Sequence, residues 1–346
     1  MDRDAFVSRI RLRRLLARIG TLAIRNRAAR RAAIHDAMFR DDAEAVAFPY
    51  ALTHGHLPDF EDPRLFLEKV RWQFLHHPDP MMQLVTDKIA VRAYHRAVRA
   101  TIPPPALIAS GEDPDDLLGI DLPDAFILEA SNGCGMNHIH MGGPVDRRRL
   151  VSLVRDWFAT EHWRRHGELF YRGIPNRWLV EEYLPADRER IEYTVLCIAG
   201  EPLWVSVLAT MPDGRKTRRP YDLSWRSVPI ELVGFPAGDR AFPRPAFLDQ
   251  LREDATRLGR HFFAARIDFL YHDGVFAFSE VTLSNNASVA PYRPVRMNAE
   301  FGERIDLARA PERLADGRRI AAELGWTVPP AFGFWGKARS PSPTAP

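Results

Sequence analysis

Two pairs of alternating strands in the second half of the chain constrain the fold most. Residues 191–200 (IEYTVLCIAG) and 201–210 (EPLWVSVLAT) alternate between apolar and polar side chains and meet at a turn centred on Gly200. Residues 265–282 (ARIDFLYHDGVFAFSEVT) repeat the pattern around Asp273-Gly274. Antiparallel hairpins with helical segments beside them predict an α+β fold and not a doubly wound parallel sheet.

The helical segments are predicted from apolar spacing. Residues 7–40 form a basic amphipathic pattern, with apolar positions at Ile10, Leu12, Leu15, Leu16, Ile19, Leu22 and Ala23 and arginines between them. Such a segment is either a helix that docks on the protein with solvated arginines, or one that lies on an anionic membrane surface or contacts nucleic acid. Four further helices are predicted: over residues 62–79, from an N-cap at Thr86 through Val98, over 147–163 and over 251–262. Residues 101–124 are expected to be rich in loops.

Composition narrows the class of protein. The 346 residues allow two or three packed units, and a net charge of +3 excludes a polyelectrolyte. Two cysteines cannot form a disulfide framework. No apolar run reaches the roughly 18 residues of a membrane helix, and the basic start lacks the pattern of a signal peptide. A cytoplasmic location is expected, with a disordered tail over residues 338–346.

A glycine turn between two strands suggests a phosphate site. Residues 126–140 (FILEASNGCGMNHIH) read as a strand, a turn at Gly133-Cys134-Gly135 and a second strand. The P-loop, the Rossmann glycine pattern and the GxSxG nucleophile elbow are absent from the sequence, so those folds lose support. The first strand ends in Glu129, an acid where a phosphate favours a base.

The second hairpin carries the strongest chemical cluster. Alternation places Arg266 and Asp268 on one face, and Glu280 returns beside them across the turn. Two adjacent carboxylates repel unless a cation neutralises them. Mg²⁺ prefers such oxygen ligands, and Arg266 would stabilise charge at a reacting centre. The alternative is a surface ladder in which Arg266 pairs with an acid across the hairpin.

Several segments in order resemble the TupA-like branch of the ATP-grasp enzymes, which is associated with teichuronopeptide and other surface-polysaccharide synthesis. They are LFLEKVRWQF, DKIAVRAY, FILEASNGCGMN, WLVEEYL, YDLSWRSVP and the second hairpin, and they span roughly residues 63–287. The resemblance implies two α+β lobes with antiparallel sheets that clamp ATP and Mg²⁺, preceded by a helical N-terminal region. It also implies that ATP phosphorylates a carboxylate and that an amine or related nucleophile attacks the acyl phosphate.

The resemblance assigns roles by position. Lys88 corresponds to a phosphate-binding lysine and Arg266 to the residue facing the transferred phosphoryl group. The phosphate loop comprises Asn132, Gly133, Cys134, Gly135 and Met136; the inter-lobe hinge comprises Glu181, Glu182 and Leu184; the Mg²⁺ ligands are Asp268 and Glu280. The implied domains are residues 1–84 (helical region), 85–184 (first lobe), 185–305 (second lobe) and 306–346 (helical extension and tail).

Three positions depart from the family pattern. Glu129 stands where the family has a second phosphate-binding lysine, so either a neighbour such as Arg92 replaces that charge or catalysis is lost or changed. Thr282 stands where ATP-grasp enzymes often carry Asn, and Asn285 or Asn286 is the expected substitute ligand. Thr194 stands where a basic residue is expected.

The remaining polar clusters are less specific. Residues 213–220 (DGRKTRRP) are expected to be a basic loop, either a solvated turn or a site for an anionic sugar or acidic peptide that uses Arg215, Lys216, Arg218 and Arg219. His138 and His140 share a strand face but lack a third zinc ligand at motif spacing. Trp204 and Trp225 are expected to be core anchors.

Three functions of different classes follow. The first is an ATP-dependent carboxylate–amine ligase in envelope polysaccharide synthesis. The second is a catalytically reduced protein that binds nucleotide or glycan, because of Glu129. The third is a sugar transferase. No nucleic-acid partner is expected, and peripheral membrane contact would use residues 7–35.

Overall fold

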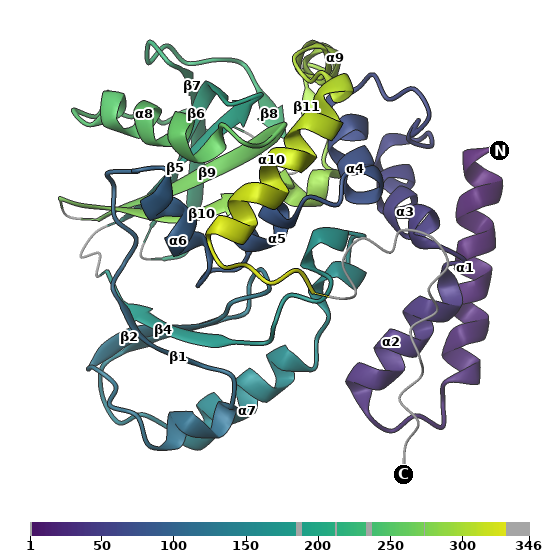
Figure 1. The fold of residues 1–346 in the computed structure, drawn as a ribbon, viewed down its shortest axis with the longest axis horizontal. Coiled ribbons are helices and arrows are strands. Elements are labelled where there is room, and N and C mark those ends of the chain that lie inside the picture. Colours follow the sequence, from purple (N-terminus) through teal and green to yellow (C-terminus); the bar gives the residue numbers. More distant parts are fainter. Residues whose placement is uncertain (1, 185–188, 212, 233–236, 273, 330–346) are drawn as a thin grey trace.

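Both predicted hairpins lie in one antiparallel sheet. The computed structural model describes residues 2–184, 189–211, 213–232, 237–272 and 274–329. Five strands pair in the order β10-β9-β5-β6-β7, at the top of Figure 1. They are β5 (Arg190–Ile198), β6 (Glu201–Thr210), β7 (Lys216–Asp222), β9 (Ala264–His272) and β10 (Val275–Thr282). Pairing of Leu196 with Trp204 and of His272 with Val275 confirms the two hairpins; Asp273 itself lies outside the described residues.

The turn between β5 and β6 requires glycine. Gly200 has a φ of +88°, in the left-handed region, and a Cβ there would lie 3.0 Å from the Cα of Arg260. Any other residue would meet both backbone strain and a close backbone neighbour. The turn therefore fixes the end of the hairpin against the segment that follows helix α8 (Leu248–Gly259).

A second antiparallel sheet forms the lower lobe in Figure 1. Its order is β1-β4-β2-β3. The strands are β1 (Leu107–Gly111), β2 (Ala125–Ala130), β3 (Asn137–Met141) and β4 (Trp178–Glu182). Helix α7 (Arg147–Phe158) covers one face, where its Leu150, Val151 and Val154 pack with Phe126 and Leu128. The opposite face of β2 remains available to the cleft, because strand residues alternate between faces.

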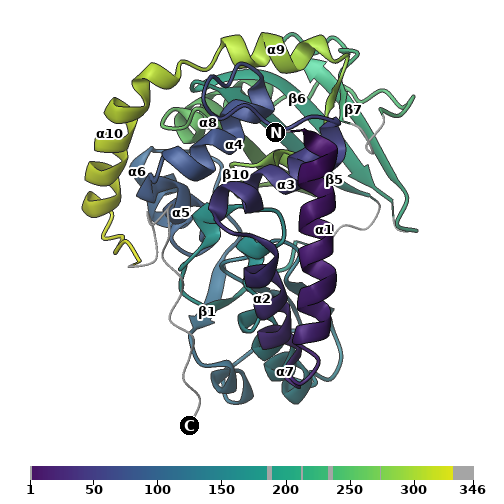
Figure 2. The same cartoon turned by 90° about the vertical axis from the view of Figure 1, so that its right-hand side faces the viewer.

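The N-terminal pattern folds as two helices, not as the single helix predicted over residues 7–40. These are α1 (Arg3–Gly20) and α2 (Arg27–Met38). Asn26 accepts a hydrogen bond from the backbone N–H of Ala29 and so begins α2 as its N-cap. Figure 2 shows α1 and α2 along one side of the molecule.

The other helices flank the upper sheet. They are α3 (Asp42–His54), α4 (Phe66–His76), α5 (Pro80–Thr86), α6 (Val91–Ala97), α9 (Arg296–Glu303) and α10 (Ala310–Glu323). The prediction that Thr86 caps a helix was wrong: Thr86 ends α5, and its hydroxyl donates to Met82. The Asp87 carboxylate accepts from the N–H groups of Ile89 and Ala90 instead, and holds the turn that presents Lys88.

One further expectation about irregular segments was wrong, and one was incomplete. Strand β1 lies inside the loop-rich residues 101–124, and it extends the lower sheet through β4. The basic segment after Gly214 is not a loop, because Lys216–Asp222 forms β7 at the edge of the upper sheet. In both cases pairing with a neighbouring strand outweighs weak local propensity. The tail over 338–346 lies outside the described residues.

Apolar packing forms three groups. The largest joins the upper sheet to α4, α5, α6 and α8, the second lies between the lower sheet and α7, and the third joins α1 to α3 through Phe6, Ile10 and Phe48. Among the described residues, no helix is both long enough and apolar enough to cross a bilayer. The predicted α+β class with two antiparallel sheets and a helical N-terminal region is confirmed.

Candidate functional site

A cavity of about 280 Å³ lies between the two sheets. It brings together residues more than 130 positions apart, since Lys88 and Gly135 line it from one side and Asp268 and Glu280 from the other. The remaining lining residues are Pro105, Ile127, Glu129, Cys134, Asn137, Ile139, Glu181, Glu182, Tyr183, Leu184, Arg190, Glu192, Arg266, Leu270, His272 and Ser279. The predicted juxtaposition of the acidic hairpin with the glycine turn is therefore present.

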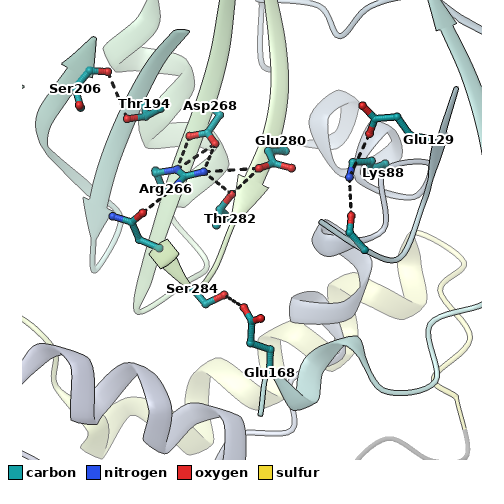
Figure 3. Close-up of polar contacts among 12 residues, drawn as sticks. Lys88, Glu129, Glu168, Thr194, Ser206, Arg266, Asp268, Glu280, Thr282 and Ser284 are labelled. Carbon is teal, nitrogen blue, oxygen red and sulfur yellow. Dashed lines mark hydrogen bonds and ion pairs between the residues drawn. The ribbon is translucent and has the colours of Figure 1, made fainter. Parts of the chain in front are cut away.

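The upper wall is built by neighbouring strands of one hairpin. Asp268 on β9 pairs directly with Glu280 on β10, after a bulge that follows Phe278. Arg266 holds Asp268 with an N–O distance of 2.5 Å and lies 3.7 Å from Glu280. Figure 3 shows the three side chains converging, with Thr282 donating to Glu280 at 3.0 Å. Asp268 is buried, so this ion pair is not the exposed surface ladder considered from the sequence.

Burial and neighbouring charges shift the pKa values of the two carboxylates in this wall in opposite directions. Burial raises the pKa of Asp268 to about 6 even though Arg266 opposes the shift, and the charge of Glu280 adds to it. Burial acts to raise the pKa of Glu280 as well, but the cationic Lys88 and Arg266 outweigh it and lower that pKa below its usual value. The two acids thus differ in their readiness to ionise near neutral pH.

In the lower wall of the cleft, the Glu129 carboxylate faces Lys88. The Lys88 ammonium lies 3.3 Å from the Glu129 carboxylate and donates to the carbonyl oxygen of Gly133 at 2.9 Å. Burial alone would lower the pKa of Lys88, but Glu129 and Glu280 outweigh it and raise the pKa above its usual value. Lys88 therefore stays charged and ties the end of β2 to the glycine turn (Figure 3).

Arg92 pairs elsewhere. Its guanidinium contacts Glu181 on β4, and no described contact joins it to Glu129. Burial raises the pKa of Glu181, against the opposing effect of Arg92. The structure thus neutralises each strand-end acid with its own cation, and Lys88, not Arg92, balances the charge of Glu129.

Some residues of the glycine turn line the cavity, and the others hold the turn in place. Cys134 and Gly135 line the cavity, and Gly135 has a φ of +72°. Asn132 points away, because its amide donates to Asn176 at 2.8 Å. A Cβ at Gly133 would lie 2.7 Å from the sulfur of Met136, so a larger residue there would force the Met136 side chain to move. Met136 therefore supports the turn and does not line the cavity.

The predicted hinge residues Glu181, Glu182 and Leu184 all line the cavity. Sequence reasoning missed Ile127, Ile139, Leu270, Glu192 and His272, which line it too. Strand alternation contained the signal: Ile127 lies two residues before Glu129, and Leu270 and His272 continue the face of Asp268. Apolar walls beside polar groups are typical of small-molecule sites.

A second, smaller cavity of about 30 Å³ lies on the far side of Arg266. Asn285 lines it and accepts a hydrogen bond from Arg266 at 2.8 Å, so this predicted metal ligand is engaged with the arginine and lies outside the main cavity. Thr194 and Ser206 line the same space, and the buried hydroxyl oxygen of Ser206 has no hydrogen-bond partner among the described residues. The cavity is also lined by Leu196, Trp204, Arg218, Pro220, Ile230, Glu231, Ala237 and Tyr292.

The four basic residues of the segment 213–220 do not converge. Arg215 pairs with Asp213 at 2.6 Å, Lys216 is exposed, and Arg219 donates to the carbonyl oxygens of Gly238 and Asp239. Only Arg218 lines a cavity, where burial lowers its pKa. The alternation of β7 separates Arg218 from Arg219, because neighbouring side chains point to opposite faces. Lys216 shares the face of Arg218 but lies at the exposed start of the strand.

The other candidate polar clusters are structural. His140 stacks on Phe126 with ring centroids 5.0 Å apart, and Trp204 packs on Phe301 within the core. Trp225 stacks on Tyr221 at 4.5 Å. Within the described residues, no group of three or more His, Cys, Asp or Glu side chains is arranged to hold a metal ion. A cation at the cleft would therefore need ligands beyond the protein.

Comparison with protein-family models finds no match, and comparison with curated proteins finds none either. Solved structures do match. D-alanine–D-alanine ligase from Bacillus anthracis, complexed with ATP, is 14% identical with a TM-score of 0.34, over 69% of this chain and 67% of that one. ATP-grasp ligase PsnB, complexed with a phosphomimetic precursor variant, Mg and ADP, is 14% identical with a TM-score of 0.33, over 72% and 65%. L-amino acid ligase from Bacillus licheniformis is 18% identical with a TM-score of 0.38, over 60% and 45%.

These likenesses are partial. The chain spans between about half and two thirds of the length of the three structures.

Proposed function

We propose that the chain is an ATP-grasp ligase that joins a carboxylate to an amine or related nucleophile at the expense of ATP. One observation carries the proposal: a single cleft holds a lysine and a glycine turn from the lower lobe against an arginine and two carboxylates from the upper lobe. Phosphate binding and charge stabilisation call for these groups, and the clamp between two sheets supplies both.

Residues of both walls would take part in the proposed reaction. The substrate carboxylate oxygen attacks the γ-phosphorus, and ADP leaves with the electrons of the broken P–O bond. An amine then attacks the acyl carbon, loses a proton, and displaces inorganic phosphate. Arg266 stands where it would stabilise the charge of the transferred phosphoryl group, and Lys88 with the backbone of Gly135 would hold the phosphates.

The charge of the cleft favours a divalent cation with the nucleotide. Among the described lining residues, carboxylates outnumber the permanently cationic side chains Lys88, Arg190 and Arg266 by six to three. A polyphosphate alone would be repelled. Mg²⁺ commonly binds through one or two carboxylates together with phosphate oxygens and waters. Asp268 and Glu280, with the Thr282 hydroxyl beside them, fit that donor set and would hold it.

The small cavity behind Arg266, at about 30 Å³, has room for the carboxylate group of a substrate but not for a whole sugar. Arg218 and Arg266 supply positive charge there, and Ser206 offers an unsatisfied buried hydroxyl. We propose an acidic sugar or peptide as the substrate, and a place in envelope polysaccharide synthesis. The support for that pathway is the ordered set of TupA-like segments, from residues 65–74 to the second hairpin.

The test begins with nucleotide binding. Thermal unfolding of the purified chain is measured with Mg-ATP, ATP with a chelator, and a UDP-sugar. Saturation at a hundred times the dissociation constant should add about 2.7 kcal/mol to the free energy of unfolding. ADP release is then followed with acidic sugars and amines. Stabilisation by a UDP-sugar but not by Mg-ATP would overturn the ligase and favour a sugar transferase.

A second candidate rests on the Lys88–Glu129 pair. Because Glu129 and Gly133 both hold the Lys88 ammonium, that charge is committed within the protein. The chain would then bind nucleotide or glycan without turnover. Mg-ATP binding with no ADP release in the wild type, and release after Glu129→Lys, would favour this candidate over the ligase.

A further inference from the structure

Helix α1 has two apolar faces, and the protein uses only one. Phe6, Val7 and Ile10 are buried, and they pack with Phe48 and Ala51 of α3. On this inner side, Arg13 pairs with the buried Glu44 at 2.7 Å. The helix is thus firmly docked along the side of the molecule shown in Figure 2.

The outer face is apolar and uncovered. It is formed by Leu12, Leu15, Leu16 and Ile19, with Leu22 just beyond the helix, each more than half exposed. Spacings of three and four residues place the four helical side chains on one stripe, and 100° per residue puts that stripe opposite Ile10. Elsewhere on the described surface, large exposed apolar side chains such as Met141 and Val295 are far fewer per element. A clustered stripe of this kind marks an interaction surface.

The charges around the stripe have one sign. Residues 5–35 contain nine arginines and no aspartate or glutamate. Arg11, Arg14 and Arg18 are exposed on the same helix as the stripe, and Arg25 follows it. An anionic partner is therefore favoured along the whole segment.

We propose that α1 lies in the plane of an anionic lipid surface, with the outer stripe in the acyl boundary and the exposed arginines at the headgroup phosphates. Apolar residues flanked by arginine are the pattern of an interfacial helix. The arginines extend toward phosphates while their stems remain beside apolar surface.

Other occupants fit less well. Pairing of this face with a second copy would bring the flanking Arg11 and Arg18 against arginines, with no acid between residues 5 and 35 to offset them. Nucleic acid would satisfy the arginines but leave the leucines against phosphates, and residues 7–34 contain no aromatic side chain to stack on bases. A lipid surface satisfies the apolar and the cationic groups together.

The experiment is sedimentation of the full chain with vesicles of phosphatidylcholine, alone or mixed with phosphatidylglycerol. The wild type should bind the anionic vesicles, with weaker binding at high salt. The triple substitution Leu15→Ser, Leu16→Ser, Ile19→Ser should lower the partition coefficient at least about tenfold, because it removes the apolar area that the helix would bury in the lipid. Arg11→Gln, Arg14→Gln, Arg18→Gln should lower it at least about tenfold on anionic vesicles and weaken the salt dependence.

Matched controls make the result specific. Met141→Ser and Val295→Ser remove exposed apolar side chains on other elements and should leave binding unchanged. All variants should unfold at the wild-type temperature, because the substituted side chains are exposed. Equal binding of the serine triple variant and the wild type, retention on DNA or RNA that the serine variant keeps, or a dimer that the serine variant dissociates would overturn the proposal. Mg-ATP binding is independent of this test.

Discussion

The two walls of the cleft achieve charge balance in different ways. The upper wall places Arg266, Asp268 and Glu280 on two paired strands of one hairpin, within 14 positions along the chain. The lower wall joins Lys88, which follows α5, to Glu129 at the end of β2, across 41 positions and a change of element. The upper arrangement depends on strand alternation and the lower one on how distant segments pack.

The two walls also differ in how firmly they hold their cationic side chains. In the upper wall, Arg266 contacts Asp268, Thr282 and Asn285 together, so its guanidinium is fixed on several sides. In the lower wall, the Lys88 ammonium has one charged partner and one carbonyl partner. A bound polyphosphate would have to compete with Glu129 for Lys88, whereas Arg266 already lies in its working position.

Glu280→Gln should have the largest effect, because it removes a carboxylate from the wall predicted to hold the cation. ADP release should fall about a hundredfold or more, the size expected when a preorganised charge contact is lost. The stabilisation by Mg-ATP should fall in parallel. The measurement is steady-state ADP release beside thermal unfolding with and without Mg-ATP.

Glu312→Gln is the matched control, since Glu312 is an exposed acid paired with Arg309 on the surface. It should behave as the wild type. Full activity of Glu280→Gln would show that the upper wall does not bind the cation.

Arg266→Ala tests the rigidity of the upper wall without any nucleotide. Removing the arginine leaves the buried Asp268 without its main partner, beside Glu280. Breaking a buried ion pair costs about 3 kcal/mol of unfolding free energy. Urea unfolding at pH 7 measures the loss. Arg319→Ala, which removes only two exposed ion pairs on α10, should cost less than about 0.5 kcal/mol. Equal losses would mean that the Arg266 network does not stabilise the fold.

Stability against pH tests the raised pKa of Asp268. Its folded pKa of about 6 lies above its ordinary value of 3.8. The folded protein therefore holds this proton more tightly than the unfolded chain does. The stabilisation is complete below pH 4 and is lost as the pH rises from about 4 to about 6, a change of roughly 2 kcal/mol.

Asp268→Asn cannot titrate and serves as the comparison. The difference in unfolding free energy between wild type and variant should move against the wild type as the pH rises through that window. A difference that stays constant between pH 4 and pH 7 would contradict the assigned environment.

The sequence predicted the upper wall well because its geometry is local. Alternation placed Arg266 and Asp268 on one face, and the hairpin turn returned Glu280 to them; the structure has both features. The lower wall required knowledge of packing that no periodicity contains. Arg92, one helical turn beyond Lys88, was the expected replacement for the missing phosphate-binding lysine at position 129, yet Arg92 extends to Glu181 on β4 instead.

The same distinction explains the other differences. Strand β7 was expected to be a loop because its charged residues have weak strand propensity, and only pairing with β6 forms it. The amphipathic pattern of residues 7–40 correctly indicated helix, but it could not show which apolar face would dock. Phe6 and Val7 were available for burial, so the leucine stripe remained outside. Periodicity predicts elements, whereas the choice of partner depends on the whole fold.

Glu129→Gln tests the adjustable lower wall and should have the smallest effect. The substitution keeps the shape of the side chain and removes the charge that holds Lys88 at 3.3 Å. The freed ammonium can then contact a phosphate, and one charge-assisted hydrogen bond is equivalent to about a tenfold gain in ATP affinity. Titration calorimetry or fluorescence with Mg-ATP measures the dissociation constant.

Glu192→Gln is the control, because it removes a different carboxylate that lines the same cavity but has no described contact with Lys88. General relief of negative charge would tighten binding equally in both variants, while release of Lys88 would tighten it more in Glu129→Gln. Weaker binding in Glu129→Gln would mean that Glu129 is needed to hold Lys88 and the glycine turn in place for the nucleotide. The pair would then be a fixed support like the network around Arg266, and the contrast between the two walls would not hold.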